Sequence, residues 1–383
     1  MTGVAELLAQ ARSATGLDDF GDDSFREGLG ILVASATREA RFTPAGRAAF
    51  FAQLVELLSQ RLQVEDWYRR HPEIDEQQIV APLIGLGLPR TGSSALSMLL
   101  AEDPAVRVIR NWEGMRPCPP PETATQALDP RIALAQQAME RRDRLFPRMK
   151  QMVPSTATSP VECQMFMAMD FRSQLFQASA HIPGYVAWLN HEADLVPTYR
   201  FVRRVLKLLQ WRCPPTRWRL KNPSHTLFID ALAEVFPDAR FWMTHRDVAS
   251  VVPSVADLYY ELSKAYSDAV DKHWLGEVTA EFCELGMRRM IAFRDAGNDR
   301  RFFDIHFAPF QQDPFPVIAA LYAFLGEELT PEARARMARW RRETPRDKHG
   351  EHRYDAADYG LDKAALRERF RFYSERFGVP AEG

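Results

Sequence analysis

Short apolar runs alternate with helical patterns through most of the chain. Residues 79–87 are apolar and are followed by Pro89 and Gly92, as in a buried parallel strand that ends in a loop. Residues 94–100 read as the start of a helix. Further strands are predicted at residues 106–109, 217–220, 240–244 and 302–307. Strands that alternate with helices indicate an α/β fold of three layers, with a central parallel sheet between helices.

Two stretches are predicted to be helical additions to this sheet. In residues 1–75, Ser24 and Glu27 have the spacing of a capping box, and apolar residues recur at helical spacing at Phe50, Phe51, Leu54, Leu57 and Leu58. Residues from about 131 to 210 are also mostly helical, and Thr330-Pro331 marks a later helix start. We therefore expect an N-terminal helical extension, residues 1–75, and an α/β domain, residues 76–383, that contains the helical insertion.

Composition and charge narrow the class of protein. The chain is 46% hydrophobic and 26% charged, with a formal net charge of -2, so it can form a large core and has no overall basic field for nucleic acid. Clusters such as Arg141, Arg142 and Arg144, or the arginines of residues 334–342, are interpreted mainly as solvated helix faces. The four cysteines form no C-x-x-C pair, which favours a reducing cytoplasm over a disulfide framework or zinc site. No signal peptide or membrane-spanning run is visible, and a homo-oligomer is left open.

The first candidate site is the loop between the first strand and the next helix. Its residues give a close backbone approach, a delocalised cation and hydroxyl donors at a helix N-terminus, which together favour an anion: Pro89, Arg90, Thr91, Gly92, Ser93 and Ser94. The loop is not a Walker A motif, because Ser93 stands where that motif has lysine. A kinase or NTPase is therefore disfavoured, and no metal is expected.

A second motif, at residues 240–254, indicates which ligand the first loop binds. Residues 240–254 read as a strand, a polar turn and a helix start, and with the Pro-Arg-Thr-Gly-Ser-Ser loop they resemble the PAPS-dependent sulfotransferase family, in its bacterial branch (PAPS is 3'-phosphoadenylyl sulfate). The resemblance implies the P-loop-like sulfotransferase fold and identifies Arg246 and Ser254 as ligands of the 3'-phosphate of PAPS and of its product PAP. A late basic loop resembles the one that closes on the same phosphate, and it contains Arg346, Lys348, His349 and Gly350.

The expected reaction is transfer of a sulfuryl group from PAPS, in line, to a hydroxyl or amine of an acceptor. Arg90 and Lys221 are the candidates for stabilising the negative charge of a loose transition state. Three residues compete as general base. We favour Glu113, which resembles the catalytic glutamate of tyrosylprotein and heparan-type sulfotransferases. His225, which resembles the catalytic histidine of cytosolic sulfotransferases, is given a supporting role, and Glu162 is a third candidate.

The acceptor is not specified by the sequence and is a small molecule, a lipid or a carbohydrate. An apolar stretch could line its pocket, although most of its members read as helix core: Met165, Phe166, Met167, Met169, Phe171, Phe176 and Trp188. Two alternatives remain at this point. One is a P-loop nucleotide or small-molecule kinase, and the other is a non-catalytic protein that binds PAP or another nucleotide.

Overall fold

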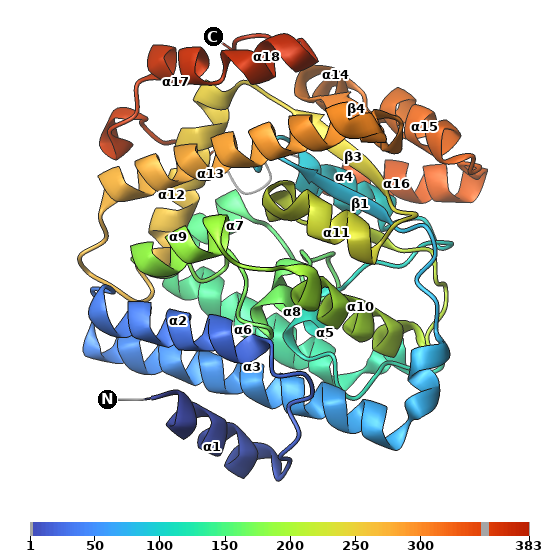
Figure 1. The fold of residues 1–383 in the computed structure, drawn as a ribbon. Coiled ribbons are helices and arrows are strands. Elements are labelled where there is room, and N and C mark those ends of the chain that lie inside the picture. The colour runs from blue at the N-terminus through green and yellow to red at the C-terminus, as the bar shows by residue number, and fades with distance from the viewer. Residues whose placement is uncertain (1–2, 346–351, 383) are drawn as a thin grey trace.

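A parallel sheet of four strands forms the centre of the molecule (Figure 1). The structure is a computed structural model, and it describes residues 3–345 and 352–382. In the described residues the strand order is β2-β1-β3-β4, and all three neighbouring pairs are parallel. The strands are β1 (Leu83–Gly87), β2 (Arg219–Lys221), β3 (Arg240–His245) and β4 (Phe302–His306). The predicted α/β class with a parallel sheet is confirmed.

Helices cover both faces of the sheet, because alternate strand residues point to opposite sides. Leu83 and Trp242 belong to a core cluster shared with α4 (Ser93–Leu100), α15 (Pro314–Leu325) and α16 (Pro331–Glu343). Ile84 and Phe241 belong to a larger cluster on the other face, shared with α10 (Val196–Gln210), α11 (Ile229–Val235), α12 (Val248–Ser263) and α13 (Lys272–Phe293). The three-layer arrangement is therefore also confirmed.

The strand predicted at residues 106–109 does not form. Only Arg107 pairs with the edge of β2, through a single parallel bridge to Trp218, with hydrogen bonds from Arg107 N to the Arg217 carbonyl and from Arg219 N to the Arg107 carbonyl. The chain then turns into the short helix α5 (Asn111–Met115), whose N-cap is Arg110. The edge strand β2 is only three residues long, and residues 106–109 are followed almost at once by α5. Both facts prevent a longer ladder of hydrogen bonds between these residues and β2.

Three helices build the N-terminal part, in blue at the bottom of Figure 1: α1 (Val4–Thr15), α2 (Phe25–Arg38) and α3 (Pro44–Arg70). The capping box predicted from Ser24 and Glu27 is wrong. Ser24 itself has helical dihedral angles, its N–H donates to Asp22 at 2.8 Å, and its side chain caps nothing. Glu27 instead accepts a hydrogen bond at 2.9 Å from Arg172, a buried residue far along the chain.

The predicted helical insertion is broken into several pieces. They are α6 (Pro130–Leu145), α7 (Pro147–Met152), α8 (Gln164–Ala168) and α9 (Pro183–His191), followed by α10. The Met and Phe side chains of residues 166–176 are fully buried in the larger core cluster. They therefore serve as core, the reading that the sequence favoured for most of them.

The remaining helices run towards the end of the chain, in orange and red in Figure 1: α14 (Phe307–Gln312), α15, α16, α17 (Lys363–Arg369) and α18 (Arg371–Phe377). Thr330 caps α16 as predicted, since its hydroxyl accepts a hydrogen bond from Ala333 N at 3.2 Å. The four cysteines are buried and unpaired. Within residues 3–345 and 352–382, none of the helices has the length and apolar character needed to cross a bilayer.

Candidate functional site

The loop between β1 and α4 makes a tight turn before the helix begins. Arg90 and Gly92 both have positive φ, of 62° and 88°, and a Cβ on Gly92 would lie 3.3 Å from the Gln311 and Phe307 side chains. The Thr91 hydroxyl donates to the Leu88 carbonyl at 2.7 Å and also contacts the Thr244 hydroxyl on β3. The loop is thus fixed above the carboxyl ends of β1 and β3, where open parallel sheets bind ligands.

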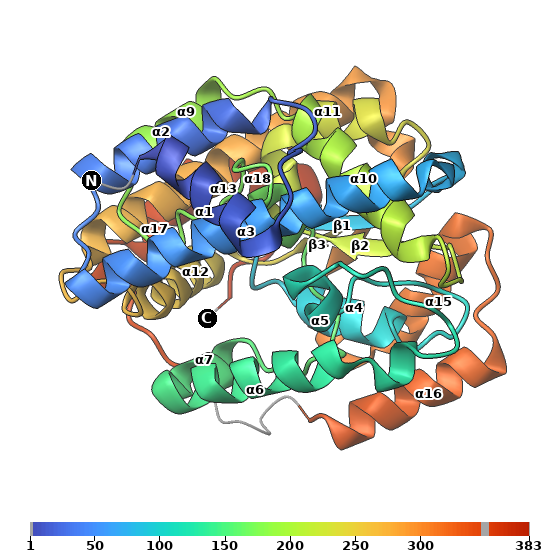
Figure 2. The same ribbon diagram turned by 90° about the horizontal axis from the view of Figure 1, so that it is seen from below.

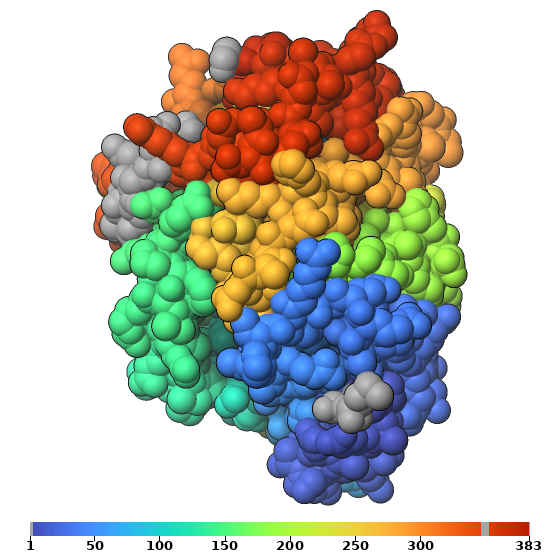
Figure 3. All heavy atoms as spheres, turned by 90° about the vertical axis from the view of Figure 1, so that its left-hand side faces the viewer, coloured from blue at the N-terminus to red at the C-terminus, as the bar shows by residue number. Residues whose placement is uncertain are grey.

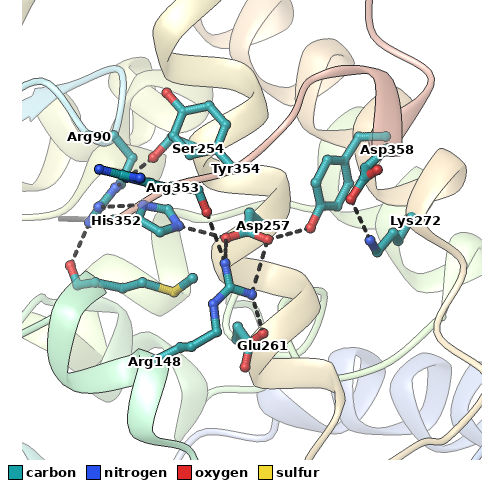
Figure 4. A network of polar contacts seen from close by, with 12 residues as sticks. Arg90, Arg148, Ser254, Asp257, Glu261, Lys272, His352, Arg353, Tyr354 and Asp358 are labelled. Atoms are coloured by element: carbon teal, nitrogen blue, oxygen red, sulfur yellow. Dashed lines mark hydrogen bonds and ion pairs between the residues drawn. The ribbon is translucent and has the colours of Figure 1, made fainter. Parts of the chain in front are cut away.

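Arg90 turns from this loop towards α12. Its Nε lies 3.2 Å from Ser254 Oγ, and its Nη1 donates to the Met152 carbonyl at 2.7 Å (Figure 4). Burial lowers the pKa of the guanidinium, which nevertheless keeps its charge at any working pH. Two residues predicted from separate motifs, Arg90 and Ser254, are therefore neighbours.

Arg246 joins them from the end of β3. Its Nη1 donates to the Arg90 carbonyl at 3.1 Å, and its guanidinium carbon lies 4.1 Å from the centre of the Phe307 ring. Its two other nitrogens are held by Glu382, with Nε to Oε1 and Nη2 to Oε2 both 2.8 Å long. Although burial opposes the shift, hydrogen bonds from Arg246 and Ser250 hold the pKa of Glu382 below its ordinary value. A carboxylate thus binds the arginine that the resemblance assigns to a phosphate, and no motif in the sequence pointed to Glu382.

Lys221 reaches the phosphate loop from the end of β2. Its Nζ lies 3.4 Å from Ser94 Oγ and forms an ion pair with Glu162. The Glu162 side chain is 24% exposed, and the main chain holds this segment in place, because Cys163 N donates to the Lys221 carbonyl at 3.2 Å. Glu162, Lys221 and Ser94 therefore form a polar group that faces both solvent and the loop.

Glu113 has a different environment from the one expected. It is 0% exposed, its Oε1 accepts from Arg107 Nη2 at 2.6 Å, and its Oε2 accepts from Arg110 N at 2.9 Å. It closes the capping box at the start of α5. Both carboxylate oxygens are in use, so this geometry does not support Glu113 as a base that receives a proton from an acceptor.

His225 is buried four residues after Lys221 along the chain. It is 1% exposed, and its Nδ1 lies 2.8 Å from the Tyr199 hydroxyl. Its Nε2 has no hydrogen-bond partner within the described residues. Burial lowers the pKa of the imidazole to about 3, so the ring is neutral at physiological pH. His225 is therefore a neutral group with one uncommitted nitrogen, fixed by Tyr199.

Arg346, Lys348, His349 and Gly350 lie outside the described residues, but the segment that follows them returns to the site (Figure 4). His352 Nδ1 lies 3.4 Å from Arg90 Nη2, and its Nε2 lies 2.6 Å from Asp257 on α12. Asp257 also accepts from Arg148 on α7 at 2.7 Å. Sequence reasoning missed this network, although Asp257 stands one helical turn after Ser254 and His352 directly follows the basic loop.

No group of three or more His, Cys, Asp or Glu side chains that could hold a metal ion occurs in the part of the chain that the structure describes. The predicted donor residues Arg90, Arg246 and Ser254 do come together, and Lys221 adjoins them through Ser94. This edge of the sheet thus combines a helix N-terminus with three cationic side chains, an arrangement suited to a ligand with several anionic groups.

Known proteins show the same architecture. Residues 82–331, well over half of the chain, match a sequence model described as "Sulfotransferase family". The crystal structure of sulfotransferase STF9 from Mycobacterium avium superposes with a TM-score of 0.92 at 32% identity, covering 100% of this chain and 98% of the other. The crystal structure of sulfotransferase STF1 from Mycobacterium tuberculosis H37Rv gives 0.82 at 31% identity, covering 96% and 98%.

A curated relative, the omega-hydroxy-beta-dihydromenaquinone-9 sulfotransferase Stf3 of Mycobacterium bovis, is 30% identical over 113 residues. That alignment spans 28% of this chain and 28% of the relative, so it covers little more than a quarter of either protein. The Stf3 protein of Mycobacterium tuberculosis CDC 1551 / Oshkosh matches to the same extent.

Proposed function

Because the chain belongs to the sulfotransferase family, we propose that it transfers a sulfuryl group from PAPS to a hydroxyl group of a lipid acceptor. The observation that supports the donor is the convergence of Arg90, Arg246 and Ser254 beside the loop that precedes α4. Arg90 belongs to one motif and Arg246 and Ser254 to another, more than 150 residues later, and the three side chains lie at one edge of the sheet. A nucleotide with phosphates at both its 3' and 5' positions suits a cluster of cationic side chains next to a helix N-terminus.

In this proposal Arg246 and Ser254 bind the 3'-phosphate. The guanidinium of Arg246 presents two parallel donors, and both bond to the oxygens of Glu382. A phosphate accepts the same two bonds. Donor binding therefore exchanges the carboxylate of Glu382 for the 3'-phosphate.

The transfer itself needs charge stabilisation and a proton acceptor. The acceptor oxygen forms a bond to sulfur while the bond from sulfur to the 5'-phosphate oxygen breaks, so that PAP leaves with the electron pair and the acceptor loses its proton. Lys221 and the loop N–H groups stabilise the negative charge that develops on the transferred group and on the leaving oxygen. Lys221 is placed for this because it already lies beside Ser94.

We assign the role of general base to Glu162. The carboxylate of Glu162 is hydrogen-bonded on both oxygens, by Lys221 and by Gln164 Nε2 at 2.5 Å, as that of Glu113 is by its own partners. Exposure separates the candidates, because the Glu162 side chain is 24% exposed whereas Glu113 and His225 are buried. When Lys221 turns towards the donor, its partner Glu162 is released to accept the proton. His225, which is hydrogen-bonded to Tyr199, keeps the supporting role.

The acceptor class rests on the relatives. The name of Stf3 describes an omega-hydroxylated menaquinone as its substrate, which is a lipid that carries a hydroxyl group. We extend that class, a hydroxylated lipid, to this chain.

The donor is tested by thermal unfolding in the presence of PAP, ADP or AMP, each with and without Mg²⁺. A ligand that binds the folded state raises the unfolding temperature by mass action. PAP is expected to raise it clearly more than AMP and without Mg²⁺, because AMP lacks the 3'-phosphate. Equal shifts for PAP and AMP would contradict the PAPS assignment, and a shift by ADP that requires Mg²⁺ would favour a phosphoryl transferase.

A further inference from the structure

Exposed leucines gather on and beside α6. Among the described residues five large hydrophobic side chains are exposed, and three of them are Leu128 at 89%, Leu134 at 52% and Leu145 at 62%. Leu134, Ala138, Arg141 and Leu145 follow one another at spacings of four, three and four residues, so they share one face of the helix. These four residues are exposed, and part of the surface of α6 and α7 (green) is visible in Figure 3.

The same side of the molecule is basic. Figure 2 shows α6, α7 and α16 along one edge, and seven exposed cationic side chains lie on these helices: Arg141, Arg144, Lys150, Arg334, Arg336, Arg339 and Arg342. The exposed acidic residues there are Glu140, Glu332 and Glu343. An excess of positive charge on this edge contrasts with the net charge of -2 for the whole chain. We call these residues, together with Leu128, Leu134 and Leu145, the α6–α16 face.

The two features together define the partner. A second copy of the chain would bring arginines against arginines if the α6–α16 face met itself, and like charges repel. A nucleic acid offers phosphates but no apolar phase in which Leu134 and Leu145 could be buried. An anionic lipid surface offers both, since leucine enters the acyl boundary while arginine side chains remain among the headgroups.

The α6–α16 face is also connected to the candidate site through hydrogen bonds of α7. Met152, the last residue of α7, accepts the hydrogen bond from Arg90 of the phosphate loop at 2.7 Å. Arg148, on the same helix, is anchored to Asp257 on α12 at 2.7 Å. A surface that holds α6 and α7 therefore also fixes the position of the donor loop.

We propose that the α6–α16 face docks the protein on anionic lipid membranes. The proposal deepens the proposed function, because a lipid acceptor would be met at such a surface, but the docking itself needs neither donor nor acceptor. Each basic residue near an anionic bilayer strengthens binding several-fold, and the leucines add their apolar area.

The test is co-sedimentation of the full chain with vesicles of phosphatidylcholine alone or mixed with phosphatidylglycerol. Binding is expected only to the anionic vesicles and is expected to weaken with salt. The pair Arg141→Gln and Arg144→Gln should weaken it roughly tenfold or more, at several-fold for each arginine. The pair Leu134→Gln and Leu145→Gln should weaken it by a similar factor, because glutamine gains little from the acyl boundary.

A matched control is Arg12→Gln with Arg38→Gln, which removes the same charge from exposed positions on α1 and α2. This control should bind vesicles as the wild type does, and all variants should keep the thermal shift with PAP if they are folded. Equal binding by all variants, or no binding to anionic vesicles, overturns the docking proposal. The proposal is also overturned if the chain dimerises with rising concentration and the same substitutions abolish the dimer. It is overturned as well if the chain binds RNA but not vesicles and the same substitutions abolish RNA binding. None of these outcomes alters the response to PAP, so docking and the proposed function fail separately.

Discussion

At the scale of single residues, the polar side chains divide into those that serve the fold and those free to act on a ligand. Glu113 and Glu162 are both glutamates, yet one is buried against Arg107 and the other adjoins Lys221 at the surface of the site. Burial and partners separate two roles that residue type alone does not.

The first prediction concerns Arg246. Arg246→Ala should weaken PAP binding by ~2 kcal/mol or more, or about thirtyfold, because a charge-assisted pair of hydrogen bonds to the 3'-phosphate is lost. AMP binding should change little. Calorimetric titration of both ligands measures the difference, and an equal loss for PAP and AMP would show that Arg246 supports the fold rather than the phosphate.

A second prediction separates the two glutamates. Glu162→Gln should lower turnover roughly a hundredfold, as loss of a positioned base does, and leave PAP affinity within about twofold. Glu113→Gln should instead lower the free energy of unfolding by about 3 kcal/mol or more, because Arg107 is left buried without its counterion. Release of PAP from PAPS in the presence of a hydroxylated lipid reports turnover, and urea unfolding reports stability. A stable, inactive Glu113→Gln protein with an active Glu162→Gln protein would return the base to Glu113.

Much of this site could be predicted from the sequence, because Arg90, Arg246 and Ser254 belong to motifs that directly follow predicted strands. The carboxyl ends of parallel strands meet at one edge of a sheet, so these motifs were expected to lie together. The partners of these residues could not. Glu382, His352 and Arg148 reach the site from distant segments, and nothing local in their sequence specifies where such a side chain ends. The burial of Glu113 could not be predicted either, because it depends on an ion pair with Arg107, which also pairs with the sheet edge.

At the scale of elements, four of the five predicted strands form, although β2 contains Arg219 and Lys221 and β4 contains the exposed Asp304. The fifth, at residues 106–109, is buried but makes only one bridge. The pattern of apolar residues along the chain indicates burial, but it does not distinguish a buried irregular segment from a strand. The ladder depends on the length of the neighbouring strand, which is a property of the fold.

A third prediction tests the packing of the sheet. A Cβ at Gly85 in β1 would lie 2.0 Å from the ring of Trp242 on β3, so the ring would have to move. Gly85→Ala should lower the free energy of unfolding by about 2 kcal/mol, in the range for overpacked cores. Gly30→Ala is the control, since a Cβ there meets nothing within 4 Å and alanine favours the helix α2. Urea denaturation of both variants decides the matter, and an unchanged midpoint for Gly85→Ala would show that the Trp242 side chain adapts freely.

At the scale of the whole molecule, one large core cluster joins the N-terminal helices to the sheet and to α17 and α18. Leu7, Phe241 and Tyr373 belong to this one cluster, so a change anywhere in it reports on the stability of most of the chain. Buried titratable side chains such as His225 make the free energy of unfolding depend on pH.

The fourth prediction is an acid dependence carried in part by His225. Burial lowers its pKa to about 3, whereas the unfolded chain takes up the proton near 6.5. Between these values the unfolded state binds one more proton, so stability falls as pH falls, by ~1.4 kcal/mol per pH unit from this group. His225→Gln should flatten the slope of the unfolding free energy by about one proton between pH 6 and about 4. Urea titrations at a series of pH values measure it, and an unchanged slope would mean that His225 is hydrated in solution.

The pair formed by Glu382 and Arg246 has a kinetic consequence under the proposed function. A carboxylate tethered to the same chain competes with any phosphate at an effective concentration of millimolar order, whatever the concentration of free ligand. The spent nucleotide then leaves by exchange, with Glu382 returning to the guanidinium as the 3'-phosphate departs, so the arginine is not left without a counterion. Such a built-in competitor weakens the hold on donor and product alike, and it shortens the time for which PAP blocks the next turnover.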